Sequence, residues 1–268
     1  MICLSGGNLP SHALTLLQKY QRKIDALPDY PSRVGAAKSH FKQYNKSSNK
    51  TFRAVRETLE TLCCGAVRCM YCEDSCADEV EHFKPKDLYP EACFVWENYL
   101  YACGPCNGPK NNKFAVFVPG QARPMEVARA KGVPIVPPQA GDPALIDPRT
   151  EDPLDFIHLD LETGFISPAG RKNSRPFHRA EYTIRVLRLN DRPELLQARK
   201  GAYHSYLARL EQYAHRKSAG AASKELDRLV AALQRMEHRS VWKEMLRQAP
   251  RIPELRQAFE SAPEAHNW

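Results

Sequence analysis

Two Cys-x-x-Cys pairs, separated by thirty residues, constrain the fold of this chain more than any other feature of its sequence. The first pair is Cys69 with Cys72, and the second is Cys103 with Cys106. Two residues between cysteines let both thiolates of a tight turn face one ion, and two such turns supply four ligands for a tetrahedral zinc ion. The spacing therefore predicts a zinc site. A purely structural zinc knuckle remains an alternative at this point.

The residues between the pairs carry groups suited to metal-dependent hydrolysis. Residues 79–83 alternate in polarity, which predicts a short strand with Glu81 and His82 on opposite faces. A carboxylate is a hard oxygen ligand suited to Mg²⁺ or Mn²⁺. A histidine with a pKa near neutrality can remove a proton from water. Asn98 follows within the insert, and Asn107 comes directly after the last cysteine.

This ordered set of residues resembles the HNH endonuclease family. Its members fold as two short strands and a helix around one catalytic metal (ββα-metal), and many carry a four-cysteine zinc site in this place. The resemblance implies that His82 is the general base and Glu81 the acidic metal ligand, although Asp or His is commoner at the latter position. It also implies that Asn98 holds the loop and orients the base. Asn107 is implied to be the second ligand of a catalytic Mg²⁺ or Mn²⁺.

Three lysines of the motif are expected to contact nucleic acid. Lys110 matches a basic residue that many members of the family carry shortly after the last Cys-Asn. Lys84 and Lys113 lie beside the other motif residues, and we predict the same role for them.

The exact residues of the motif narrow the resemblance to one branch of the family. Glu-His-Phe-Lys-Pro-Lys, and later Leu-Ile-Asp-Pro at 145–148, resemble the HNH proteins of retron and Septu anti-phage systems (the PtuB type). The resemblance covers about residues 68–202. It implies a DNA endonuclease that works beside an ATPase of the ABC or SMC-like type, as a homodimer or in a larger hetero-complex.

Two other functions remain open. The chain could be an RNA-directed HNH nuclease, such as a tRNA-cutting effector, because HNH chemistry does not depend on a 2′-hydroxyl. It could also be a non-catalytic zinc-binding adaptor for an ATPase, although the joint presence of Glu81, His82, Asn98 and Asn107 argues against this.

Composition bounds the remaining possibilities. A chain of 268 residues with 43% hydrophobic and 26% charged residues is typical of a soluble globular protein. The net charge of +8 favours an anionic partner. The opening residues carry no signal-peptide pattern and no stretch approaches the length of a membrane span, so we expect a cytoplasmic protein with reduced thiols.

The patterning predicts an α+β fold that is mostly helical, in four parts. These are a helical N-terminal region (1–64), the HNH core with its zinc site (65–118), an arm with a β-hairpin (119–175) and a helical C-terminal region (176–268). Ser11 and Ser240 are predicted to cap helices. Helices are expected at 11–27, 31–44, 51–64, 194–217, 224–237, 241–248 and 253–259.

Charge is distributed unevenly along the chain. Residues 1–60 carry ten basic and four acidic side chains, whereas residues 61–120 carry five basic and eight acidic ones. An acidic nuclease core needs phosphate contacts from elsewhere. The candidates are the basic residues of the second and third predicted helices and the connector between them: Lys38, Lys42, Lys46, Lys50, Arg53 and Arg56. The alternative is that they are ordinary solvated charges.

Overall fold

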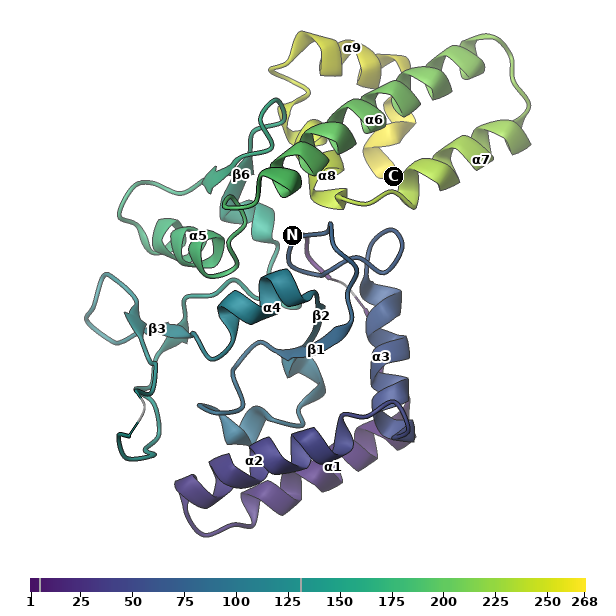
Figure 1. Ribbon diagram of the computed structural model, residues 1–268. Coiled ribbons are helices and arrows are strands. Elements are labelled where there is room, and N and C mark those ends of the chain that lie inside the picture. Colours follow the sequence, from purple (N-terminus) through teal and green to yellow (C-terminus); the bar gives the residue numbers. More distant parts are fainter. Residues whose placement is uncertain (5, 131) are drawn as a thin grey trace.

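Helices occupy the two ends of this molecule, and a small β-hairpin with a short helix lies between them (Figure 1). The computed structural model describes residues 1–4, 6–130 and 132–268. About half of the residues are helical and the sheets are small, which confirms the predicted α+β class.

The N-terminal end consists of helices in the predicted places: α1 (Ser11–Asp25), α2 (Tyr30–Tyr44) and α3 (Lys50–Leu62). The side chain of Asp29 accepts a hydrogen bond from the Ser32 amide at 2.8 Å, and Asn49 caps α3 in the same way. Such caps satisfy amides that have no partner inside the helix. The cap predicted for α1 is wrong. Ser11 is already helical, and Pro10, which offers no side-chain acceptor, occupies the cap position.

The segment between the cysteine pairs folds as an antiparallel hairpin followed by a helix. Its elements are β1 (Glu79–His82), β2 (Tyr99–Ala102) and α4 (Gly104–Lys110). Glu79 pairs with Ala102 and His82 pairs with Tyr99. Cys103 occupies the cap position of α4, so this helix begins at the second cysteine pair.

Two further small sheets follow. The first has the order β4-β3-β5, and the second is a hairpin; their strands are β3 (Ala115–Phe117), β4 (Met125–Glu126), β5 (Asp142–Pro143), β6 (Ile157–Leu159) and β7 (Ile166–Pro168). The hairpin confirms the prediction for this segment. The arm predicted to precede this hairpin also contains regular structure, because β4 and β5 lie within it. Strands of two residues are too short to show a periodicity of two.

The C-terminal end is helical, as predicted. Its helices are α5 (Arg175–Val186), α6 (Pro193–Ser218), α7 (Ser223–Gln234), α8 (Arg239–Gln248) and α9 (Pro253–Ser261). Ser240 does not cap α8. It lies inside the helix, where its amide donates a hydrogen bond to Glu73 at 3.1 Å, and His238 occupies the cap position. The buried Trp242 packs against Phe259 with a ring-centroid distance of 5.4 Å, which joins α8 to α9.

Short 3₁₀ helices complete the chain: η1 (Pro90–Ala92), η2 (Trp96–Asn98), η3 (Pro153–Asp155) and η4 (Pro263–Asn267). Arg149 joins the segment after β5 to η2 and the start of β2. Its guanidinium donates to the Tyr99 carbonyl at 3.2 Å and lies 4.5 Å from the centre of the Trp96 ring. Buried apolar side chains from both helical ends and from the central hairpin form one continuous cluster. Among the residues that the structure describes, no helix combines the length and the apolar composition that crossing a membrane requires.

Gly164, in the turn between β6 and β7, is expected to be intolerant of a side chain. Its φ is +73°, and a Cβ atom would lie 2.2 Å from the Leu196 carbonyl oxygen of α6. Gly164→Ala should therefore lower the free energy of unfolding by roughly 1–3 kcal/mol, the usual range for local backbone strain. Urea denaturation of the purified variant measures this change.

Gly201 supplies the matched control, since it lies within α6 and a Cβ there would meet nothing within 4 Å. Gly201→Ala should raise the free energy of unfolding by about 0.5–1 kcal/mol, because glycine inside a helix costs that much relative to alanine. Equal effects of the two substitutions would contradict the packing described here.

Candidate functional site

The four cysteines of the two pairs meet at the start of α4. Their sulfur atoms all lie within 4.8 Å of one another, and all four residues are buried: Cys69, Cys72, Cys103 and Cys106. A tetrahedral ion about 2.3 Å from each sulfur separates the sulfurs by about 3.8 Å. The Cys72 and Cys103 sulfurs are 3.8 Å apart. The cluster therefore fits a structural metal ion such as zinc.

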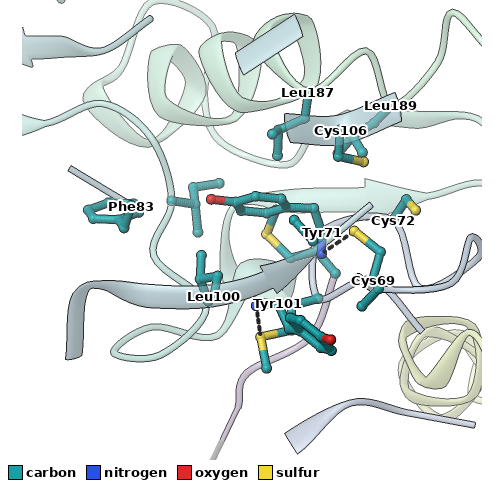
Figure 2. Packing of buried hydrophobic residues seen from close by; sticks show 14 of the residues in the cluster. Cys69, Tyr71, Cys72, Phe83, Leu100, Tyr101, Cys106, Leu187 and Leu189 are labelled. Carbon is teal, nitrogen blue, oxygen red and sulfur yellow. Dashed lines mark hydrogen bonds between the residues drawn. The ribbon is translucent and has the colours of Figure 1, made fainter. Parts of the chain in front are cut away.

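Neighbouring hydrogen-bond donors would stabilise the negative charge that metal-bound sulfurs carry. The Tyr71 amide donates to the Cys69 sulfur at 3.4 Å, as Figure 2 shows. Arg192, just before α6, donates to the Cys106 sulfur at 3.3 Å. Burial lowers the pKa of Arg192, but the charges of Cys106 and Cys72, with the hydrogen bonds to them, together outweigh that effect and raise the pKa. Hydrogen bonds to ligand sulfurs orient them and offset their negative charge.

β1 places Glu81 and His82 on its two faces, as the alternation predicted. Both residues are buried, and both line a cleft of about 460 Å³. Asn107 of α4 lines the same cleft, whereas Asn98 lies outside it. The structure thus brings three of the four predicted catalytic residues to one cavity.

The structure corrects the role predicted for Lys110. This residue is fully buried, forms an ion pair with Glu81 and donates to the His82 carbonyl at 2.8 Å. An ammonium group held in this way cannot reach a phosphate at the surface. Burial raises the pKa of Glu81, and the positive charge of Lys110 opposes that rise.

His82 is held by one ring nitrogen. Its Nε2 lies 2.9 Å from the Cys93 carbonyl oxygen, which can only accept, so Nε2 carries the proton. Within the described residues, no group hydrogen-bonds Nδ1. The rings of Phe41 and Tyr99 pack edge-on against the imidazole, at centroid distances of 4.4 and 5.2 Å. Burial lowers the pKa of His82 well below its usual value, with Lys86 contributing in the same direction, so the ring is neutral near pH 7.

Asn98 binds the loop that carries the Cys93 carbonyl. Its amide oxygen accepts from the Lys84 amide at 2.7 Å, while its amide nitrogen donates to the carbonyls of Lys84 and Ala92 at 3.1 and 2.9 Å. The side chain therefore closes the loop between β1 and η1. Cys93, whose carbonyl meets His82, follows Ala92 directly.

Asn107 has an unforeseen partner, since its amide nitrogen donates to Glu79. Glu79 is exposed and lines the same cleft as Glu81. The patterning of residues 79–83 placed Glu79 and Glu81 on one strand face, which was the available signal for a second carboxylate here. Among the described residues, nothing hydrogen-bonds the amide oxygen of Asn107.

The other two predicted lysines lie away from the cleft. Lys84 points over the Tyr89 ring, with its nitrogen 5.8 Å from the ring centre, and lines a second cavity with Asn98. Lys113 is exposed after α4 and lines neither cavity. Their proposed contacts with nucleic acid stay predictions.

The purified protein is expected to contain about one zinc ion per chain, and Cys103→Ser should lose it. Metal binding and folding are one event in such sites, so the variant should also melt at a markedly lower temperature. Elemental analysis and thermal denaturation measure the two effects. Cys76→Ser is the control, because Cys76 is exposed and outside the cluster. Full metal content in Cys103→Ser would exclude the cluster as the metal site.

Comparison with known proteins agrees with the resemblance seen in the sequence. The chain is 32% identical over 155 residues to a candidate HNH endonuclease of retron Vc95 from Vibrio cholerae serotype O1 biovar El Tor. It is 48% identical over 48 residues to the Septu protein PtuB of Bacillus thuringiensis. These matches cover 55% and 16% of this chain, and 62% and 19% of the two relatives. No family model matches the chain. The chain therefore resembles the HNH nucleases of retron and Septu systems.

Proposed function

We propose that this chain is a metal-dependent HNH endonuclease that hydrolyses DNA phosphodiester bonds. One observation carries the proposal: a buried, neutral His82 has one nitrogen fixed by a backbone carbonyl, and it lines a cleft with Glu81 and Asn107. The hairpin of β1 and β2 with α4 is, in this reading, the ββα-metal core. The name of the retron relative supports the nuclease assignment, and the retron and Septu names support a role in anti-phage defence.

His82 acts as the general base. The Nε2 proton is committed to the Cys93 carbonyl, so the lone pair lies on Nδ1 and can take a proton from an attacking water. Asn98 is a positioning residue, since it fixes the loop that presents the Cys93 carbonyl. The packing of Phe41 and Tyr99 prevents the ring from rotating away.

Oxygen donors lie on the face of β1 that is opposite to His82. Glu81, the amide oxygen of Asn107 and the neighbouring Glu79 form a set of hard ligands suited to Mg²⁺ or Mn²⁺. When bound, such an ion would stabilise the negative charge that develops on the phosphate and on the leaving oxygen. Lys110 holds Glu81 in place from the buried side. The cysteine cluster, in this proposal, holds zinc and has no part in the chemistry.

His82→Ala is expected to abolish cleavage of plasmid DNA while zinc content and fold remain intact. Loss of a general base typically costs a factor of about 10²–10⁴ in rate. A time course of nicking in the presence of Mg²⁺ measures this loss. His12→Ala is the matched control, because His12 is exposed on α1, away from the cleft.

The same assay separates the alternative functions. Cleavage of total RNA but not of plasmid would reassign the substrate. Cleavage of neither substrate by the wild-type chain would favour a zinc-binding adaptor. Wild-type rates in His82→Ala would place the general base elsewhere.

A separately encoded ATPase of the ABC or SMC-like type is the partner we propose for the nuclease. The resemblance to retron and Septu proteins supports this, and the helical ends outside the central hairpin offer surface for the contact. Co-expression with the neighbouring reading frames should give a complex in size-exclusion chromatography. Elution of this chain alone, with unchanged cleavage, would contradict the proposed partnership.

A further inference from the structure

The cleft that holds His82 has a second wall, which comes from the N-terminal helices. Phe41 of α2, Asn45 at its end and Arg56 of α3 line this wall. The opposite wall consists of β1, α4 and the residues around them. The cleft is therefore built from helices that precede the first cysteine pair and from the motif itself, and the sequence motif supplies only one of its two walls.

Two basic side chains line this cleft, Arg56 and Lys86. Of the six basic residues considered from the sequence, Arg56 alone is among them, so the structure selects it from that group. The acidic side chains of the cleft are Asp78, Glu79 and Glu81. In the described parts of the chain, neither Arg56 nor Lys86 forms a salt bridge with a carboxylate.

Neutral oxygens hold the Arg56 guanidinium at the cleft. It donates to the side chain of Asn45, to the Phe52 carbonyl at 3.1 Å and to the Lys46 carbonyl at 3.5 Å. A guanidinium has five N–H donors, so these three bonds leave two donors for a ligand. A guanidinium that is fixed in place and not neutralised is well suited to a phosphate, which it can bind through two parallel hydrogen bonds.

Lys86 reaches the cleft from the loop after β1. Its nitrogen lies 5.1 Å from the centre of the Phe41 ring, and that ring packs against His82. This contact places the ammonium beside the proposed general base. An acidic cleft that accepts a polyanion needs such charges, because metal-ligating carboxylates by themselves repel phosphates.

We infer that Arg56 and Lys86 bind backbone phosphates of the nucleic-acid strand that is cut at His82. The inference rests on the proposed nuclease function and names residues outside the HNH motif that complete its binding site. The helices α2 and α3 then form part of the substrate-binding site, in addition to their role in the fold.

Binding measurements without turnover test this inference. The parent is His82→Ala, and the ligand is a short fluorescein-labelled DNA duplex, titrated by anisotropy in Mg²⁺ at several salt concentrations. Arg56→Gln and Lys86→Gln should each weaken binding about tenfold. Each should also reduce the slope of log affinity against log salt by about 0.9, the effect of one lost phosphate contact. Arg56→Lys should retain most of the slope because it keeps the charge.

Arg53→Gln is the matched control, since Arg53 is exposed on the same helix and does not line the cleft. It should keep the parent's slope. Arg56 also joins α2 to α3, so its removal could loosen the fold. Lys86 has no hydrogen bond among the described residues, and Lys86→Gln therefore tests binding without this complication. Slopes of Arg56→Gln and Lys86→Gln equal to that of Arg53→Gln would overturn the inference, as would a parent that binds no duplex.

Failure of the proposed nuclease function gives a different result. A wild-type chain that cuts neither DNA nor RNA refutes the nuclease, whereas the salt slopes still report whether Arg56 and Lys86 hold phosphates. Normal cutting with unchanged slopes refutes only the phosphate contacts.

Discussion

The meeting of four sulfur atoms at the start of α4 determines where the groups of the cleft lie. Cys103 lies between the last residue of β2 and the first residue of α4, so the position of the cluster sets the point at which the helix leaves the hairpin. One turn later, Asn107 faces Glu79, and Lys110 reaches Glu81 near the end of the helix. A shift of the helix by one residue would rotate these side chains by about 100°. The cluster therefore fixes the geometry of the cleft without forming part of it.

The polar groups of the hairpin are arranged in two layers. On one face, Glu81 lies against a buried ammonium, and on the other His82 lies against aromatic rings and a carbonyl. Buried charged groups are tolerated only when paired, and buried imidazoles when hydrogen-bonded. Glu81 is paired and His82 is hydrogen-bonded, which explains how two adjacent ionisable residues can both be buried in a strand of four residues.

Much of this architecture could be predicted from the sequence because local rules determine it. The cysteine spacing predicted the cluster, and apolar periodicity predicted most helices to within a few residues. The errors have physical causes. The burial of Lys110 depends on where α4 packs, and no pattern within the helix shows this. Ser240 and Ser11 have the side chains of helix caps, but the backbone enters each helix one or two residues earlier. Arg192 contacts a sulfur atom 86 residues away, where spacing gives no information.

The contact between Arg192 and the Cys106 sulfur has a consequence for the order of assembly. It spans 86 residues and joins the start of α6 to the cluster. On a ribosome that adds about 5–20 residues per second, these 86 residues take roughly 4–17 s to appear. All four cysteines have left the synthesis site by then, so the cluster can form while α6 is still absent. The surface on which the C-terminal helices pack can therefore form before they are synthesised.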